Sequence, residues 1–374
     1  MSLTPTISDD ALYAEALAPK SEAAKTNLIG LDLEGVEALV LSLGEAKFRA
    51  RQLHSWVYVH TVRDFESMQN LSKPLREKLA EHCQIGTLKL AEKQVSQDGT
   101  QKYLFELSGA QKVESVLMPF EERDSYAVCL STQVGCAVNC DFCATGKLGF
   151  KRQLRADEIV EQLLWIRHDT GLDVRNIVLM GQGEPLLNYD EVLKAIRLIN
   201  QSAEIGMRHI TLSTSGIIPA IERLAEERLQ LNLAVSLHAP NNEVRNSFMP
   251  INRKYPLEKL VPAVRNYAEK TGRRVTIEYI LLDGVNDSIA LAEELLKLLN
   301  GVNCLINLIP YNPIGDAGRI AGSVEAGIVY KRPNRNRVEA FRKVLQRGPH
   351  VVTVRLERGA DIAAACGQLQ NQSS

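Results

Sequence analysis

Three of the seven cysteines in this sequence lie within eight residues, where residues 136–143 read CAVNCDFC. Cys136, Cys140 and Cys143 are separated by three and then two residues, a spacing typical of ligands to zinc or to an iron–sulfur cluster. A structural zinc site needs four ligands, and Cys129 is the only further cysteine nearby. A 4Fe–4S cluster can leave one iron open for a substrate, so the triad favours a cluster over zinc.

A second loop that could do chemistry reads Gly181-Gln182-Gly183-Glu184-Pro185 and follows the apolar run NIVLM. A dinucleotide-binding fingerprint would need a third glycine at the next position, which is a leucine. The proline also fits poorly in such a turn. The loop therefore supplies a carboxylate and close backbone groups, but does not predict a nicotinamide or flavin site.

The elements that position these loops alternate in type. From Tyr126 onward, short apolar runs typical of strands alternate about six times with amphipathic stretches typical of helices. This order predicts parallel strands with right-handed crossovers, in an open sheet or in a complete or partial barrel. In barrels the chemistry lies after the carboxyl ends of strands. The polar residues found at such ends are Gly183, Glu184, Ser213, Ser236, His238 and Asn312.

The first hundred residues have a different pattern. Residues 38–62 and 71–82 carry apolar side chains at helical spacing, which predicts a small helical domain. An Asp98-Gly99 turn then separates two strand-like runs, and KVESVLMPF follows as a third. A short antiparallel ribbon is therefore expected between the two domains.

Composition predicts an ordinary globular protein. The chain of 374 residues is 45% hydrophobic and 24% charged, and it has no apolar run long enough to cross a bilayer. Its first residues resemble neither a signal nor a transit peptide, so we expect a cytoplasmic protein without a membrane partner. The net charge of -1 does not decide on a nucleic-acid partner. Local basic clusters favour RNA binding: Lys47, Arg49, Arg51, Lys147, Lys151, Arg152, Arg155, Lys331, Arg332, Arg335 and Arg337.

The cysteine motif and the GQGEP loop together resemble the signatures of the radical S-adenosylmethionine enzymes. The resemblance narrows to the adenine carbon-2 methyltransferases of 23S ribosomal RNA and tRNA. It rests on the order of FRARQLHSWVY, QVGCAVNCDFCATGKLGF, LSTSG, SLHAPN, RVTIEY, NLIPYNP and ADIAAACGQL. This family implies an α/β fold with a partial (βα)6-type TIM barrel, a 4Fe–4S cluster and S-adenosyl-L-methionine. A sister family that methylates carbon 8 is the nearest alternative, and a non-enzymatic, zinc-containing RNA-binding protein is a distant one.

The resemblance also implies roles for individual residues. Carbon 2 of adenine is electron-poor, so a methyl group is first placed on a cysteine and is then delivered by a radical route. In that scheme Cys366 carries the methyl group, Glu114 accepts the carbon-2 proton, and Cys129 frees the product by forming a disulfide with Cys366. The implied cluster ligands are Cys136, Cys140 and Cys143, and the implied cofactor contacts are Gly183, Glu184, Ser213, Ser236, Leu237, His238 and Asn312.

The same resemblance implies a division of the chain and a set of partners. Residues 1–86 would form a helical RNA-binding domain, 87–121 an antiparallel linker with Glu114, 122–361 the radical core, and 362–374 a segment with Cys366. The partners would be 23S rRNA at the peptidyl transferase centre, tRNA beside its anticodon, and a flavodoxin-like electron donor, with a monomeric enzyme. Two departures from the family are the long segment 313–337, and Gln182 where a methionine is common.

Overall fold

The computed structural model describes residues 25–120, 125–314 and 329–371. Its main sheet has ten strands in the order β14-β13-β12-β11-β10-β9-β6-β5-β4-β3, and the strands from β14 to β6 run parallel. These parallel strands are β6 Ser125–Cys129, β9 Asn176–Leu179, β10 Ile210–Thr214, β11 Asn232–Ser236, β12 Val275–Leu281, β13 Cys304–Pro310 and β14 Val351–Val354. The predicted α/β partial barrel is confirmed.

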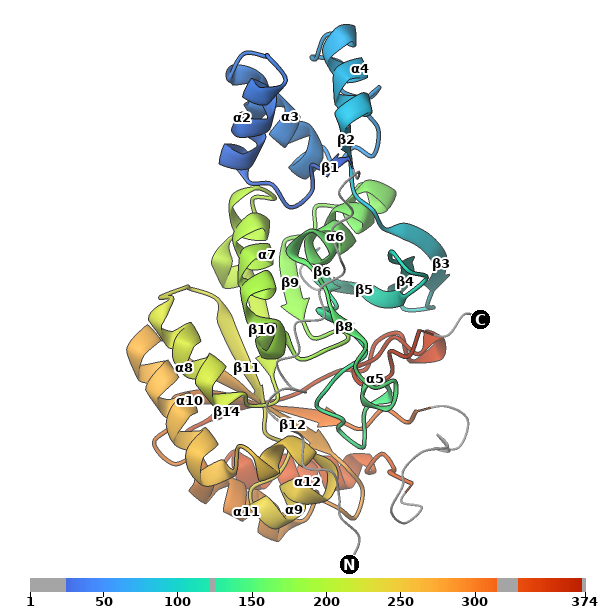
Figure 1. Cartoon of the computed structure of the whole chain (residues 1–374). Coiled ribbons are helices and arrows are strands. Elements are labelled where there is room, and N and C mark those ends of the chain that lie inside the picture. Colours follow the sequence, from blue (N-terminus) through green and yellow to red (C-terminus); the bar gives the residue numbers. More distant parts are fainter. Residues whose placement is uncertain (1–24, 121–124, 315–328, 372–374) are drawn as a thin grey trace, which may run out of the picture.

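A helix follows each of the first six parallel strands and packs on the outside of the curved sheet (Figure 1). These helices are α6 Ala156–Thr170, α7 Tyr189–Gln201, α8 Ile218–Glu226, α10 Leu257–Thr271, α11 Ile289–Leu298 and α12 Arg335–Leu345. In α7 the buried residues Val192, Ile196 and Ile199 recur at helical spacing, which forms the apolar stripe that faces the strands. Gly171 ends α6 in the left-handed conformation that an L side chain adopts reluctantly.

The antiparallel ribbon extends the same sheet. It comprises β3 Lys89–Val95, β4 Gln101–Glu106 and β5 Lys112–Phe120, and β5 pairs with β6. Val116 of β5 lies directly opposite Cys129 of β6. Because side chains alternate along a strand, Glu114 shares the face of Val116. The register therefore places the predicted proton acceptor and the predicted resolving cysteine on neighbouring strands.

The N-terminal helices lie at one end of the molecule (Figure 1). They are α2 Leu33–Ser42, α3 Phe48–Tyr58 and α4 Lys73–His82, bracketed by the short parallel pair β1 Thr26–Asn27 and β2 Cys83–Gln84. The buried Glu161 of α6 pairs with Arg63 at 2.9 Å and accepts backbone hydrogen bonds from Thr87 and Leu88. These contacts fix the helical region against the barrel. The domain boundaries given above remain a prediction.

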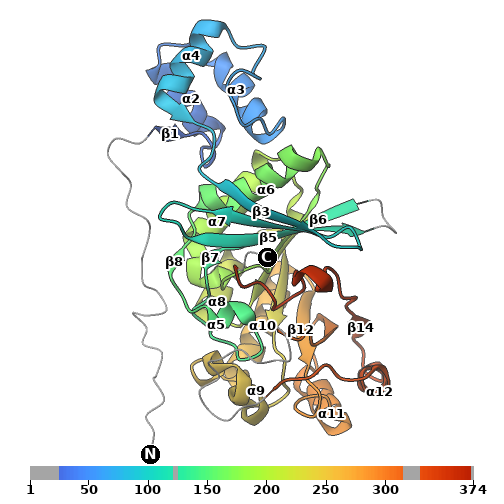
Figure 2. The same cartoon turned by 90° about the vertical axis from the view of Figure 1, so that its right-hand side faces the viewer.

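The chain ends in a segment that passes between the antiparallel strands and the barrel (Figure 2). After β14 and the short helix η6 Ala360–Ile362, the Leu369 carbonyl accepts from Thr145 Oγ1 at 2.8 Å, and the Gly367 carbonyl accepts from Ala144 N at 2.7 Å. Both partners belong to α5 Ala144–Lys147, directly after the cysteine triad. In the unusually long link 313–337, residues 315–328 lie outside the described residues.

The remaining short elements all lie in loops of the barrel. They are β7 Gln133–Val134, β8 Arg152–Gln153, α9 Asn242–Phe248, η2 Pro185–Asn188, η3 Met207–His209 and η4 Pro250–Arg253. Among the described helices, none is long and apolar enough to cross a membrane.

Candidate active site

The three clustered cysteines lie on the loop between β7 and α5. Burial raises the pKa of each thiol, and the charges of the other two cysteines raise that of Cys140 further. The loop is closed by a hydrogen bond from Asp141 N to the Phe248 carbonyl, at 2.9 Å. Metal coordination requires thiolates and releases their protons, so a bound metal would offset the cost of ionising these buried thiols.

The geometry of the triad differs from that of a single-ion site. Within the described ranges, no three His, Cys, Asp or Glu side chains are placed so that they could hold one metal ion. In a 4Fe–4S cluster the cysteines ligate different irons, so their sulfurs need not converge on one point. Cys129 instead packs with Val116, Met118 and Leu369, in a small apolar cluster that contains none of the triad. The triad and its buried surroundings therefore fit an iron–sulfur cluster.

Arg245 is a buried cation near the triad that the sequence did not reveal. It is fully buried, and its guanidinium donates to the carbonyls of Ser215 at 2.7 Å, Ser236 at 3.1 Å and Leu237 at 2.9 Å. Burial lowers its pKa to about 10, while the neighbouring Cys140 acts in the opposite direction. Arg245 thus joins the ends of β10 and β11 and places a cation beside the triad. No spacing rule distinguishes such an arginine from one on a solvated helix.

The GQGEP loop packs tightly against the strand ends. Gly183 has a φ of 102°, and a Cβ there would lie 2.6 Å from Gln133 Cβ, so only glycine fits. Glu184 is buried, and its Oε2 accepts from both the amide and the hydroxyl of Ser215 at 2.7 Å. Burial raises the pKa of Glu184, and the hydrogen bonds from Ser215 oppose that shift. Ser215 was missed in LSTSG, although it lies two positions beyond Ser213.

The other predicted cofactor contacts line the same edge of the barrel. Ser213 lies in β10, and Ser236 ends β11, directly before Leu237. His238 is buried with a φ of 61°, its Nδ1 accepts from Ile280 N at 3.0 Å, and its ring lies edge-on to Phe142, with centroids 5.2 Å apart. Burial lowers the pKa of His238 to about 3, so the ring is neutral. These residues surround the triad, but their contacts with a cofactor remain predictions.

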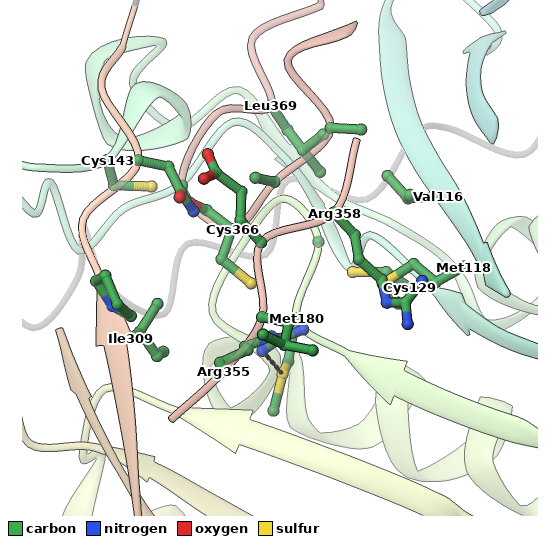
Figure 3. A pocket seen from close by; sticks show the side chains of 18 of the residues that line it. Val116, Met118, Cys129, Cys143, Met180, Ile309, Arg355, Arg358, Cys366 and Leu369 are labelled. Atoms are coloured by element: carbon green, nitrogen blue, oxygen red, sulfur yellow. Dashed lines mark hydrogen bonds between the residues drawn. The ribbon is translucent and has the colours of Figure 1, made fainter. Parts of the chain in front are cut away.

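A cavity of about 780 Å³ opens beside the triad and is lined by Cys129 and Cys366, the two cysteines predicted to form a disulfide (Figure 3). Cys143 lies on one side of it, Cys129 on the other, and Cys366 comes from the C-terminal segment between them (Figure 3). Asn312 also lines the cavity, and its side-chain amide donates to the Cys366 carbonyl at 3.4 Å. The structure therefore brings together a triad cysteine and the two predicted redox cysteines.

Arg355 lies in the cavity beneath Cys366 (Figure 3). The charges that Cys366, Glu278 and Cys129 carry when ionised raise the pKa of this guanidinium. Conversely, burial raises the pKa of Cys129 to about 12, and Arg355 opposes that shift. Arg355 was not predicted from the sequence. It directly follows β14, and functional residues of barrels lie after the carboxyl ends of the strands.

Glu114 does not line the cavity, because the C-terminal segment covers it. Its side chain is fully buried, with Oε2 accepting from the amides of Gln370 at 2.7 Å and Asn371 at 3.0 Å. Lys102, itself buried on β4, places its ammonium 3.3 Å from Oε1. Gln182 fastens the same segment, since its amide donates to Asn371 Oδ1 at 2.8 Å. Glu114 thus lies just behind the residues that carry Cys366.

Several of the basic residues predicted to bind RNA have partners within the protein. Arg152 is buried and forms a double hydrogen bond with Glu158, and Lys147 pairs with Asp141 at 2.6 Å. Lys151 is exposed. In the other two clusters, the exposed basic residues are Lys47, Arg51, Lys331, Arg332, Arg335 and Arg337.

Comparisons with known proteins match nearly the whole chain. The family model of the radical SAM superfamily matches residues 130–296, and that of the ribosomal RNA large subunit methyltransferase N-terminal domain matches residues 26–85. The probable dual-specificity RNA methyltransferase RlmN of Caldanaerobacter subterraneus is 47% identical over 92% of this chain and 98% of its own length. The RlmN relative of Geobacillus kaustophilus is also 47% identical, over 92% of both chains. A crystal structure of a radical SAM methyltransferase from Sphaerobacter thermophilus has a TM-score of 0.86 and 42% identity, covering 93% of this chain and 100% of that one.

Proposed function

Since the chain belongs to the RlmN-type RNA methyltransferases of the radical SAM superfamily, we propose that it methylates carbon 2 of adenine in 23S rRNA and tRNA. The observation that carries this proposal is the place of Cys366, which shares one cavity with the triad residue Cys143 and with Cys129. A thiol in this position can receive a methyl group on the cofactor side and present it to a base on the other side.

The radical SAM family uses a 4Fe–4S cluster and S-adenosyl-L-methionine. Cys136, Cys140 and Cys143 would hold the cluster, and the strand-end residues would hold the cofactor. When bound, these groups supply an electrophilic methyl group and a carbon-centred radical. Adenine carbon 2 cannot attack a methyl sulfonium directly, so a carrier thiol and a radical route are both required.

The protein's own groups then divide the work. The Cys366 thiol first loses its proton, and the resulting thiolate takes up the methyl group by displacement, with the thioether of the demethylated cofactor as the leaving group. Once the S-methyl group has given up a hydrogen atom to the radical and its carbon is bonded to carbon 2 of the base, the adduct gives up one electron and Glu114 takes the carbon-2 proton. This step requires the C-terminal segment, whose Gln370 and Asn371 amides cover Glu114 in this structure, to move aside. The Cys129 thiolate attacks the Cys366 sulfur, and the bond from that sulfur to the methylene carbon breaks. Its electron pair passes to the base, the methylene carbon takes up a proton to become the methyl group, and a Cys129–Cys366 disulfide remains. An external reductant, for which we propose a flavodoxin-like or dithiol system, must restore the two thiols.

The burial of Cys129 supports this division. Burial raises the pKa of its thiol to about 12 even with the opposing charge of Arg355, so the thiol is mostly protonated and weakly nucleophilic. Arg355 is the cation that acts on it, and it lies beside Cys366 as well.

We propose RNA partners because the relatives are probable dual-specificity RNA methyltransferases. We propose that the helical region before residue 87 contacts RNA, that the enzyme is a cytoplasmic monomer, and that the segment after residue 361 delivers Cys366. The relatives share this helical region and the barrel over most of their length.

The direct test is mass spectrometry of nucleosides. The purified protein, loaded anaerobically with cluster, is incubated with S-adenosyl-L-methionine, a reductant, and 23S rRNA or tRNA from cells that lack it. With the wild type we expect 2-methyladenosine in both RNAs, and with Cys366→Ala we expect it in neither RNA. Formation of 8-methyladenosine instead would assign the chain to the carbon-8 chemistry, and an unmethylated Cys366 in the wild type would overturn the carrier mechanism.

A further inference from the structure

The cavity around Cys366 has two chemically different ends. On one side of Cys366 are Cys143 and Asn312, close to the triad, so this end belongs to the cofactor. On the other side, Val116 and Met118 of β5 pack beside Cys129 of β6, and these three side chains line an apolar part of the cavity (Figure 3). If the cofactor fills the first end, the second end is the path by which a base reaches Cys366.

At the mouth of this second end, an aromatic ring lies next to a guanidinium. Phe120 is the last residue of β5, and it shares the cavity face with Val116 and Met118 because side chains alternate along the strand. Its ring is 37% exposed, and the Arg358 guanidinium lies over it at 5.2 Å from the centroid. Leu356, which is 76% exposed, adds a further apolar side chain to the same rim.

We infer that Phe120 and Arg358 form a platform on which an unpaired base of the substrate RNA, next to the target adenine, stacks. This inference rests on the proposed function, because it requires RNA as the substrate. An adenine that reaches Cys366 must leave its stack, and the neighbouring base then loses one face of its own stacking. Aromatic rings and arginine planes are the usual surfaces on which proteins receive such bases.

The chemistry of the rim favours a nucleobase over other occupants. A purely apolar partner would leave the Arg358 charge without compensation, whereas RNA brings both a flat π surface and a phosphate. Stacking on an aromatic ring depends little on which base is stacked. Such a platform therefore suits an enzyme whose relatives are dual-specificity RNA methyltransferases. The alternative is that Phe120 and Arg358 form a surface cation–π pair that stabilises the end of β5 and contacts no RNA.

A double-mutant cycle distinguishes a platform that stacks an RNA base from a surface pair that only stabilises β5. The probe is a hairpin RNA with the target adenine in its loop, together with two versions that are abasic on its 5′ or 3′ side. Binding of each RNA is measured by fluorescence anisotropy for wild type, Phe120→Ala and Phe120→Trp. We expect Phe120→Ala to weaken binding of the intact hairpin on the order of 5- to 100-fold, and Phe120→Trp to retain it. One abasic RNA should bind wild type and Phe120→Ala equally, because its stacking base is missing.

Two further variants serve as controls for the same measurement. Ile289→Ala removes an apolar side chain that is 44% exposed on α11, outside the cavity lining, and should leave RNA affinity unchanged. Arg358→Gln should weaken binding and reduce the slope of log affinity against log salt by about one. Methylation of Cys366 without RNA should be normal in every variant, which shows that the carrier chemistry is intact.

The possible outcomes are distinct. If Phe120→Ala binds the intact hairpin as tightly as wild type, or loses equal affinity for all three RNAs, the platform is overturned. A wild type that does not methylate Cys366 refutes the proposed function, whatever the binding data show. If Phe120→Ala loses affinity for the intact hairpin and for only one of the two abasic RNAs, and Cys366 is methylated, the result supports the platform.

Discussion

Replacing Glu114 by glutamine should block product release, and the structure predicts a second effect that must be separated from the first. The carboxylate accepts two backbone hydrogen bonds from Gln370 and Asn371 and faces the buried ammonium of Lys102 at 3.3 Å. Glutamine is nearly isosteric, but it carries no charge. The variant therefore loses both a proton acceptor and a structural anchor of the C-terminal segment.

The structural effect can be estimated from these contacts. Hydrogen bonds to a charged acceptor contribute about 1.5–3 kcal/mol each and neutral ones about 1 kcal/mol, so two bonds lose about 1–4 kcal/mol in total. Removing one partner of a buried ion pair costs about 3–5 kcal/mol of stability, because the other charge is left unpaired. We therefore expect Glu114→Gln to unfold at lower denaturant concentration and to hold its C-terminal segment less tightly.

The double variant Lys102→Met with Glu114→Gln separates anchoring from catalysis. It removes both buried charges, which is far less costly than removing one, so much of the lost stability should return. If Glu114 takes the carbon-2 proton, the double variant should still accumulate a covalent protein–RNA adduct and little free methylated RNA. Gel electrophoresis under denaturing conditions and nucleoside mass spectrometry measure these products. Free 2-methyladenosine at the wild-type rate from either variant would refute the role of Glu114.

The other predictions concern the cysteines and His238. Cys140→Ala should contain no cluster iron while Cys129→Ala contains the full amount, because Cys129 packs apart from the triad; loss of iron from Cys129→Ala would contradict this. Cys129→Ala should also be isolated with covalently bound RNA linked through Cys366, whereas Cys366→Ala should be free of RNA; equal crosslinking in both would refute the carrier scheme. His238 has a folded pKa of about 3, below the usual value of about 6.5, so its stabilising effect is present above pH 6.5 and is lost as the pH falls. Between pH 7 and 5.5 the wild type should lose about 1.2 kcal/mol more stability than His238→Gln in urea titrations, and parallel curves would argue against a neutral buried ring.

The sequence predicted most of the framework because its signals are periodic or local. Alternating strand and helix patterns identified the barrel, and the Asp98-Gly99 turn identified the hairpin of β3 and β4. These signals depend only on neighbours along the chain, and so they are visible without tertiary contacts. The pairing of β5 with β6, which joins the ribbon to the barrel, depends on register between strands and carries no comparable signal.

The residues that were missed share a different property. Arg245, Arg355 and Lys102 are long cations whose partners are distant in sequence or are carbonyl groups. A basic residue in a sequence is most often on a solvated face, and only folding shows that Arg245 and Lys102 are buried and that Arg355 is partly buried beside the cavity cysteines. Cys366 was found because a family motif surrounds it, and the structure adds that it faces Cys129 and Arg355 across one cavity.

The way each group is attached explains how one cavity can serve successive steps. Cys129 lies on β6, and Glu114 lies on the adjacent β5, so a continuous hydrogen-bonded sheet fixes both. Cys366 lies on a segment that hydrogen-bonds to α5, Glu114 and Gln182. Breaking these hydrogen bonds would leave the strand pairing of the sheet intact. A carrier must approach the cofactor to be loaded and the base to be unloaded, while the groups that finish the reaction must stay in place. In the proposed scheme, the carrier Cys366 therefore lies on the hydrogen-bonded C-terminal segment, and the proposed finishing groups Cys129 and Glu114 lie on the sheet.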